Sequence, residues 1–548
     1  MRALGPISRL YQFVVKESPE SWKLVLYMAL LSGIANGVLL GVINAGALAA
    51  SSDSTSLRLL LLFAIAMTVF VMAKKMALVR STITVERLVK RLRIRVSDKI
   101  RKCKYVLLES LGRGDLYTKI SQDTNFISQA SHVIINAAQE AVVVVFCLVY
   151  IATLSFAACF VTVISILLAV YIYYYHQRAL LADLKEWTRR EAVMLDSLGH
   201  LVDGFKEVKV NRKRSDSLFD SIKFIAADAE TLRSKTGIRF VTDVMFAQVF
   251  FYLLIATIIF LLPRLVPTYA DVVIRTTAAI LFIIGPLEAV VSAAPILSRA
   301  NVALDNLYKL EDLLDTAQED GEPVMAEGFS GFREIHVRSL VFSYLDPAGV
   351  PTFTIGPITF SLPRGQMLFI VGGNGTGKST FLKLLTGLYY PRQGLIRVDD
   401  QEIHPGNLAA YRDLFSPIYS DFHLFDRLYG LEDIEESKVT ALLSEMELEG
   451  KTEYLHGKFS TQNLSSGQRR RLALIVSLLE DKDVYVFDEW AADQDQRFRR
   501  HFYEVILRDL KSRGKTVVVI THDDRYWSTA DRLIKMDYGE MVEQDGLG

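Results

Sequence analysis

The chain has little cysteine and no net charge. Only three cysteines occur among 548 residues, at Cys103, Cys147 and Cys159, with no CxxC pair and no histidine cluster beside them. This pattern argues against a disulfide framework or a zinc site. We expect the three cysteines to serve instead as small apolar residues in or near membrane helices. Basic and acidic residues balance at 62 each, so the net charge does not suggest a nucleic-acid partner.

Apolar residues, in contrast, are abundant. They make up 51% of the chain, which is too much for an ordinary soluble enzyme. The N-terminus lacks the pattern of a cleavable signal peptide, so the first apolar segment is expected to remain as a membrane helix. Segments long enough to cross about 30 Å of hydrocarbon lie near residues 24–50, 57–74, 131–152, 155–175, 240–262 and 272–297.

Positive charge is concentrated in two of the connections between these segments. The long connections, after the second and the fourth segment, are rich in Lys and Arg, whereas the short ones contain almost none. The positive-inside rule therefore places the long connections, the N-terminus and the C-terminal half in the cytoplasm. A basic loop can also bind nucleic acid, but the flanking spans favour topology as the explanation. Leu88, Leu92, Val96 and Ile100 recur at helical spacing, which predicts that the membrane helices continue into the cytosol.

A phosphate-binding motif stands in the C-terminal half. The sequence Gly-Gly-Asn-Gly-Thr-Gly-Lys-Ser-Thr at 372–380 fits G-x-x-x-x-G-K-[ST], between an apolar strand pattern at 367–371 and a helix pattern at 381–385. Such a loop wraps phosphates with its backbone N–H groups, while the lysine reaches the terminal phosphates and the serine helps to hold Mg²⁺. A glycine-rich turn is the alternative. We predict that the chain binds ATP or GTP through Gly372, Asn374, Gly375, Gly377, Lys378, Ser379 and Thr380.

Two carboxylates and a histidine follow further strands. Asp488 and Glu489 end the apolar run 484–487, and His522 closely follows the run 517–520. Asp488 is suited to hold Mg²⁺ and Glu489 to polarise the attacking water, while His522 is suited to contact the γ-phosphate. A strand ending in two acids is common, and a lone histidine is more often structural. The polar turn at 464–468 opens a helix, and such an N-terminus can bind phosphate.

Together and in this order, these elements resemble the ATP-binding cassette transporters. Residues 464–468 resemble the family's signature motif, Asp488 and Glu489 its Walker B pair, and His522 its switch histidine. Tyr344 matches the aromatic residue that stacks on adenine. In that family, the signature of one cassette completes the ATP site of the other, so the resemblance implies a dimer with two ATP molecules. The residues that would face the partner's ATP are Ser465, Ser466, Gly467 and Gln468.

The resemblance also implies a fold and a division into domains. Residues 1–315 would form an α-helical six-span transmembrane domain of the type IV exporter fold, and 316–331 a linker rich in Asp, Glu and Gly. Residues 332–548 would form an α/β nucleotide-binding domain, in agreement with the alternating strand and helix patterns from Phe332 onward. The family's coupling helices correspond to residues 114–124 and 201–215. Because this chain carries the cassette motifs from both sides of an ATP site, a homodimer would be sufficient to form the two sites.

The chain departs from the family pattern at two places. Ser420 stands where most cassettes carry the Q-loop glutamine, which coordinates Mg²⁺ and reports its arrival to the membrane domain. We expect Ser420 to supply the Mg²⁺ contact, with Asp421 as a conjectural substitute. The stretch Trp-Ala-Ala-Asp-Gln-Asp at 490–495 replaces the common pattern, and only Asp495 carries over as the D-loop aspartate.

These departures resemble one subfamily, the cyclic-peptide and siderophore exporters, which includes the pyoverdine, syringomycin and microcin exporters. The segments that carry the resemblance are Asp-Glu-Trp-Ala-Ala-Asp-Gln-Asp at 488–495, Gly-Pro-Ile-Thr-Phe at 356–360, the doubled glycine at 372–373, and His-Asp-Asp at 522–524. The resemblance implies ATP-driven export of an amphipathic peptide across the bacterial inner membrane.

Within the spans, Glu140 and Glu288 are the candidates for contact with cargo, because ionisable groups in a membrane usually face a cavity or a partner. Hydrogen bonding between helices is an equally good explanation. Three other functions stay open. One is a flippase for a lipid or a lipid-linked amphiphile, and another is an ATP-gated channel or regulatory subunit, against which intact Glu489 and His522 argue. An importer is disfavoured by the order of spans and cassette.

Overall fold

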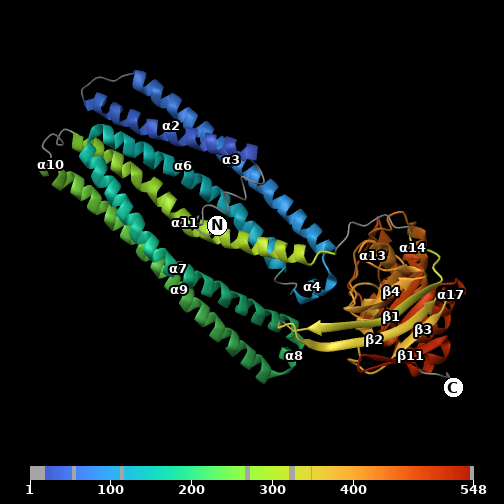
Figure 1. The fold of residues 1–548 in the computed structure, drawn as a ribbon. Helices are drawn as coiled ribbons and strands as arrows, with labels where there is room; N and C mark the ends of the chain where they lie inside the picture. Colours follow the sequence, from blue (N-terminus) through green and yellow to red (C-terminus); the bar gives the residue numbers. More distant parts are fainter. Residues whose placement is uncertain are drawn as a thin grey trace. The chain divides into compact units, whose positions relative to one another are not determined.

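The computed structural model describes residues 19–51, 57–111, 116–265, 272–319, 328–346 and 348–543. The chain divides into two compact units (Figure 1). The first comprises Met1–Asp98 and Arg113–Leu313, and the second comprises Lys99–Gly112 and Leu314–Gly548. Half of the expected linker at 316–331, residues 320–327, lies outside the described residues.

Long helices build the first unit. Two of them, α7 and α9, are capped at their N-termini by a side chain. Ser155 Oγ accepts from Ala158 N at 3.3 Å, and Asn211 Oδ1 accepts from Arg214 N at 3.1 Å. Pro286 and Pro295 lie inside a continuous helix. The long helices are α2 Pro19–Ser51, α3 Leu57–Lys102, α6 Thr124–Leu154, α7 Phe156–Asp203, α9 Arg212–Ala256 and α11 Val273–Thr316. The shorter ones are η1 Thr118–Asp123, α8 Phe205–Val210, η2 Thr257–Leu261 and α10 Leu262–Leu265, while the short helix α4 Tyr105–Ser110 belongs to the second unit.

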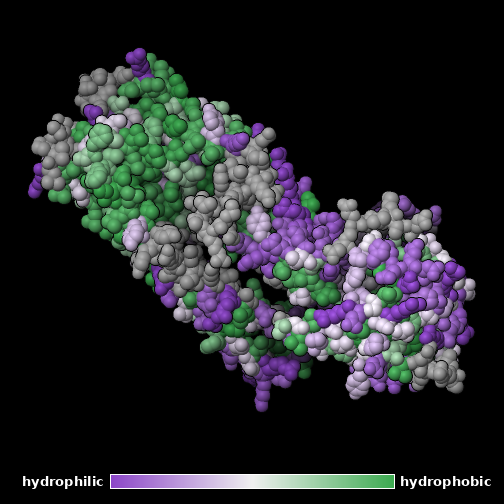
Figure 2. Space-filling view, viewed as in Figure 1, coloured by the Kyte–Doolittle hydropathy of each residue, from purple (hydrophilic) through white to green (hydrophobic). Residues whose placement is uncertain are grey.

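Several of these helices are suited to lipid. Within the described residues, four are long and apolar enough to cross a membrane: Lys23–Ala47, Leu57–Lys102, Lys119–Leu154 and Val273–Thr316. Two further apolar helices, Phe156–Ile172 and Gln248–Arg264, are shorter. Figure 2 shows apolar residues over much of the visible face of this unit, and Leu60, Ile65 and Met72 are among the exposed ones. Such a surface is expected where lipid replaces water as the solvent. Because four helices of the described residues meet the length and composition of a span, the expected number of six spans remains a prediction.

Two short helices lie near the expected coupling helices. The range 114–124 lies partly outside the described residues, and the short helix that precedes it is α4, which belongs to the second unit. The range 201–215 contains α8, which Gly204 and Asn211 separate from α7 and α9.

A mostly parallel sheet forms the centre of the second unit. Its strand order is β12-β11-β3-β10-β9-β6, and only β12 runs antiparallel. The strands are β3 Met367–Val371, β6 Phe415–Ile418, β9 Val484–Asp488, β10 Thr516–Ile520, β11 Arg532–Asp537 and β12 Glu540–Glu543. Residues of β3, β9 and β10 are buried throughout, as expected for central parallel strands whose sequences are continuous apolar runs.

Alternation along these strands divides the core in two. Phe369, Phe487 and Val519 belong to one cluster of buried residues, whereas Ile370 and Val518 belong to the other, because successive side chains of a strand point to opposite faces. Helices provide much of the first cluster, and an antiparallel sheet provides much of the second. The helices of this unit are α12 Lys378–Leu385, α13 Leu408–Arg412, α14 Glu436–Glu445, α15 Ser466–Glu480, η4 Trp490–Asp493, α16 Gln496–His501, η5 Phe502–Ile506, α17 Leu507–Ser512 and η6 Asp524–Thr529.

The antiparallel sheet has the strand order β2-β1-β4-β5. Its strands are β1 Glu334–Leu345, β2 Pro351–Pro363, β4 Gln393–Val398 and β5 Gln401–Glu402, and a separate hairpin joins β7 Tyr454–Leu455 to β8 Lys458–Phe459. In the parallel sheet, Ile520 pairs with both Ile370 and Asp488. The carboxyl ends of β3, β10 and β9 therefore meet at one edge, where α/β proteins place their ligands.

Candidate ATP-binding site

The phosphate loop connects β3 to α12 at this edge. Gly372 has φ 149°, and a Cβ there would lie 2.3 Å from the Met536 carbonyl oxygen, so only glycine fits. Lys378 begins α12, and its Nζ donates to the carbonyl oxygens of Gly372 at 3.0 Å and Gly373 at 2.7 Å. Burial lowers the pKa of Lys378, although the carboxylates of Glu489 and Asp488 oppose this shift. The loop thus holds a cation at the N-terminus of a helix, which suits a phosphate.

Replacing Lys378 by alanine is expected to weaken ATP binding about tenfold to a hundredfold, because a charge-assisted hydrogen bond contributes about 1.5–3 kcal/mol. Equilibrium binding of a fluorescent ATP analogue measures the effect. Lys482→Ala is a matched control, since Lys482 pairs with Asp413 away from the loop, at 3.6 Å. Equal affinity of Lys378→Ala and the parent protein would contradict the assignment.

Asp488 ends β9 as a buried carboxylate without a hydrogen-bond partner. It is 1% exposed, and among the described residues neither of its oxygens accepts a hydrogen bond. Burial raises the pKa of Asp488, and the neighbouring Glu489 carboxylate adds to this shift, whereas the Ser379 hydroxyl and the backbone and hydroxyl of Ser420 lower the pKa only in part. An orphaned carboxylate beside two hydroxyls fits Mg²⁺, which prefers oxygen ligands and is usually held by few carboxylates plus substrate phosphates. The described residues contain no cluster of three or more His, Cys, Asp or Glu that could hold a metal.

Glu489 and His522 face each other across the ends of β9 and β10. His522 Nε2 lies 3.0 Å from Glu489 Oε1, although the two residues are 33 positions apart. Glu489 has φ 50°, a left-handed conformation that is uncommon for glutamate and frequent at functional sites. A cavity of about 210 Å³ adjoins the pair. Its remaining lining residues are Ala491, Ala492, Arg499, Tyr503, Thr521 and Asp523.

Tyr344, the expected adenine-stacking residue, lies on β1 and contacts the start of α12. Its hydroxyl is 3.2 Å from Thr380 Oγ1 and donates to the Tyr389 hydroxyl at 3.1 Å. Its ring packs edge-on against Phe342 and Tyr389. Stacking on adenine therefore stays a prediction, but the structure places Tyr344 beside the phosphate loop.

The signature residues cap α15. Ser465 Oγ accepts from Gln468 N at 3.3 Å, and Gln468 Oε1 accepts from Ser465 N at 3.0 Å, which completes a capping box. A Cβ on Gly467 would lie 2.8 Å from the Asp493 carbonyl oxygen. Within the described residues, no hydrogen bond joins these residues to the phosphate loop.

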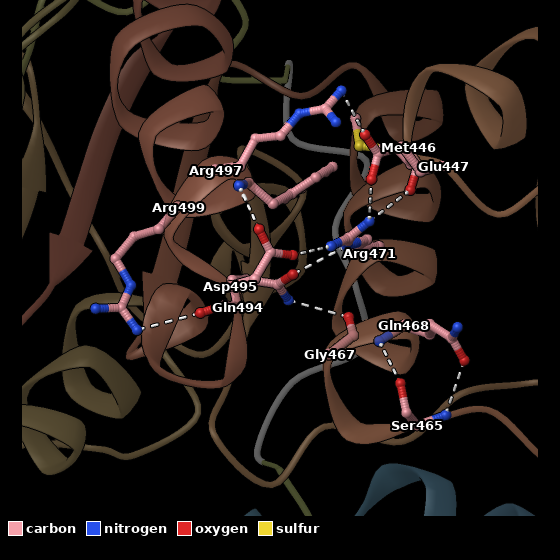
Figure 3. A network of polar contacts seen from close by, with 11 residues as sticks. Met446, Glu447, Ser465, Gly467, Gln468, Arg471, Gln494, Asp495, Arg497 and Arg499 are labelled. Carbon is pink, nitrogen blue, oxygen red and sulfur yellow. Dashed lines mark hydrogen bonds and ion pairs between the residues drawn. The ribbon is translucent and has the colours of Figure 1, made fainter.

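A polar network ties the signature helix to the D-loop (Figure 3). The Arg471 guanidinium donates to Gln494 Oε1 at 3.0 Å, to Asp495 Oδ2 at 2.8 Å and to Glu447 Oε2 at 3.1 Å. Gln494 Nε2 donates to the Gly467 carbonyl at 3.0 Å. Hydrogen bonding by backbone N–H groups, first that of Phe498, lowers the pKa of Asp495.

Arg470 makes a second connection. It donates to the Glu489 carbonyl oxygen and pairs with Asp493 at 3.0 Å. The sequence interpretation named Asp495 but missed Arg470, Arg471 and Gln494; the basic run at 469–471 was the available signal. These contacts make the signature helix, the D-loop and Glu489 one connected block.

In the first unit, Glu140 lies 3.7 Å from Lys74. This contact joins α6 to α3 and matches the helix-to-helix alternative for Glu140. Glu288 is exposed on α11. Within the described residues, no shared ion-pair or hydrogen-bond partner connects Glu140 and Glu288.

Comparisons with known proteins agree with this geometry. A family model described as ABC transporter matches residues 355–492. The chain is 32% identical over 471 residues to the ATP-binding protein SyrD of Pseudomonas syringae pv. syringae, which covers 83% of this chain and 82% of that protein. It is 27% identical over 354 residues to the ATP-dependent lipid A-core flippase of Vibrio cholerae, which covers 61% of this chain and 58% of the flippase.

A solved structure of a bacterial Atm1-family ABC exporter with ATP bound has the same fold, with a TM-score of 0.75 at 19% identity over 98% of this chain and 95% of that chain. The predicted fold class, helical membrane segments joined to an α/β cassette, is thereby confirmed. Similarity to SyrD over most of both proteins confirms the family. The chain belongs to the ATP-binding cassette transporters, as an exporter that couples ATP hydrolysis to transport across a membrane.

Proposed function

We propose that two copies of this chain form an ATP-driven exporter of an amphipathic peptide: a cyclic peptide, a lipopeptide or a peptide siderophore precursor. The observation that carries the ATPase part is the meeting of Lys378, Asp488, Glu489 and His522 at one sheet edge. Residues 1–315 would form the membrane domain in the inner membrane, with 332–548 and the N-terminus in the cytoplasm.

Each residue at this edge then has a role. The phosphate loop binds the β- and γ-phosphates, with Lys378 neutralising their charge. Ser379 and Asp488, joined by Ser420, would hold Mg²⁺, which when bound stabilises charge on the phosphate oxygens. Glu489 would orient and polarise the attacking water, and His522 would hold Glu489 and contact the γ-phosphate. The capped N-terminus of α15 would bind the partner copy's ATP.

Peptide cargo is favoured over lipid by two observations. Several segments, Asp-Glu-Trp-Ala-Ala-Asp-Gln-Asp at 488–495 among them, resemble the cyclic-peptide and siderophore exporters. The similarity to SyrD extends over 83% of this chain, whereas that to the lipid A-core flippase extends over 61%. The flippase relatives keep a lipid cargo as the second candidate.

Transport into inside-out membrane vesicles tests the cargo class. We expect ATP-dependent accumulation of a cyclic lipopeptide or a peptide siderophore precursor with the parent protein and none with Glu489→Gln. A fluorescent phospholipid and purified lipid A serve as the lipid probes. Lipid translocation without peptide uptake, at normal ATP hydrolysis, would replace the peptide assignment by the flippase.

A further inference from the structure

The segment Lys99–Gly112 belongs to the same compact unit as the cassette. Its chain is anchored beside the end of α11, where Lys104 N donates to the Ala317 carbonyl at 2.8 Å and Lys99 Nζ pairs with Asp315 at 2.7 Å. Since α3 continues directly into this segment, any displacement of Lys99–Gly112 acts on a helix long and apolar enough to span the membrane.

Glu109 on α4 makes a polar contact between this segment and the cassette's first helix, α12. Its carboxylate accepts from Lys383 Nζ at 2.9 Å and from the Tyr389 hydroxyl. Burial alone would raise the pKa of Glu109, but the hydrogen bonds from Tyr389 and Lys383 lower it overall. Lys383 also lies 5.3 Å from the ring centroids of both Tyr105 and Tyr389, which suits cation–π attraction. The carboxylate is therefore held in its charged form by two donors.

From Tyr389, hydrogen bonds continue to the phosphate loop. The Tyr389 hydroxyl accepts from Tyr344, and the Tyr344 hydroxyl lies 3.2 Å from Thr380 Oγ1. Tyr389 is 1% exposed and Thr380 is 8% exposed, so neither has water as a ready substitute partner. Phe342 stacks on the Tyr389 ring at a centroid distance of 4.7 Å and fixes its position.

This path ends at the two groups that ATP would engage. Thr380 follows Ser379 in the phosphate loop, and Tyr344 is the expected adenine contact. A phosphate that takes the Thr380 hydroxyl would remove a partner from Tyr344, and an adenine that repositions the Tyr344 ring would remove the Tyr344 hydroxyl from Tyr389. Lys383 lies one and a half turns along the helix that begins at Lys378, so a shift of α12 toward phosphate would also move the Lys383–Glu109 pair.

The side chain at the expected Q-loop position is shorter in this chain than the family's usual glutamine. Ser420 replaces the Q-loop glutamine, is exposed, and neighbours Asp488. A serine hydroxyl reaches one bond beyond Cβ, whereas a glutamine carries a donor and an acceptor three bonds out. The residue therefore suits contact with the metal site but has less reach toward another segment.

We propose that ATP occupancy is transmitted to the membrane segments through Thr380, Tyr344, Tyr389 and Glu109. Without nucleotide, the hydrogen-bonded path holds α4 in one position; with nucleotide, Tyr344 and Thr380 turn to the ligand and α4 is released to follow Lys383 and α12. Tyr389 and Glu109 are positioning residues that do not touch ATP. This inference rests on the nucleotide contacts proposed above for Tyr344 and Thr380.

Hydrogen–deuterium exchange of the full-length protein in lipid nanodiscs tests the path, with and without Mg²⁺ and a non-hydrolysable ATP analogue. In the parent protein, the analogue should protect residues 372–385 and change the opening equilibrium of 99–112 about fivefold or more. In Tyr389→Phe and Glu109→Gln, protection of 372–385 should persist while the change at 99–112 falls below about twofold. The basal ATPase rate should be unchanged in both variants.

Tyr411→Phe is the matched control, because it also removes one buried tyrosine hydroxyl, which donates to the Leu385 carbonyl instead of the path. It should keep the response at 99–112. Persistence of that response in Tyr389→Phe and Glu109→Gln would overturn the proposal. Before nucleotide is added, exchange at 99–112 in these variants should already resemble that of the parent protein with the analogue, because the bonds that hold α4 are missing. Exchange equal to that of the nucleotide-free parent protein would also overturn the proposal. Absence of protection at 372–385 in the parent protein would overturn the proposed ATP site itself and the path with it.

Discussion

Replacing Glu489 by glutamine should stop ATP hydrolysis while leaving ATP bound, with a loss in turnover of about a hundredfold or more. The amide keeps the shape of the side chain and can keep the 3.0 Å contact with His522 Nε2, but it cannot accept a proton from water. It also removes a negative charge that acts on Lys378 and would repel the phosphates. Phosphate release and binding of a fluorescent ATP analogue measure the two quantities separately.

Glu504→Gln makes the same chemical change at an exposed position on η5 and should leave both quantities unaltered. Hydrolysis by Glu489→Gln within a few-fold of the parent rate would remove Glu489 from its proposed role. Loss of ATP binding together with hydrolysis would instead identify Glu489 as part of the binding surface.

Replacing Asp488 by asparagine should abolish Mg²⁺-dependent hydrolysis and yet stabilise the nucleotide-free protein. The carboxylate is 1% exposed and lacks a hydrogen-bond partner among the described residues, so its burial costs free energy that a neutral amide largely avoids. A gain of roughly 1 kcal/mol corresponds to a rise in melting temperature of about 2–4 °C for a unit of this size. Scanning calorimetry without nucleotide and an ATPase assay with Mg²⁺ provide the two readouts.

Asp483→Asn is the matched control, because Asp483 is paired with Arg364 at 3.1 Å and should gain no stability when neutralised. A lower melting temperature of Asp488→Asn than of the parent protein would show that the carboxylate has a stabilising partner. Unchanged hydrolysis would show that the metal is held elsewhere.

The strands and the phosphate loop could be predicted from the sequence because their signals are local. Continuous apolar runs of about five residues mark buried parallel strands, and β3, β9 and β10 follow these runs closely. Asp488, Glu489 and His522 were predicted at or after the ends of such strands, and the transporter resemblance grouped them. Parallel strands share one carboxyl edge, and the pairing of Ile520 with Asp488 brings the three residues there.

The membrane segments were predicted less completely. Hydropathy identified six segments, of which four lie in helices that meet the length and composition of a span, while 155–175 and 240–262 overlap shorter apolar helices. The helices at these two places continue with polar residues well past the apolar part. Hydropathy measures the apolar stretch and therefore leaves the ends of such helices undetermined.

The sequence by itself determined the family, the cassette motifs and the residues suited to ATP chemistry, since each depends on residue types at short, fixed spacing. Only the tertiary structure decided that Arg471 links the signature helix to Asp495 and that Glu109 meets Tyr389, 280 residues away. Such contacts join single polar residues from distant segments, and neither periodicity nor a motif records them. They arise because buried polar groups need partners, and folding of the whole unit decides which partners are within reach.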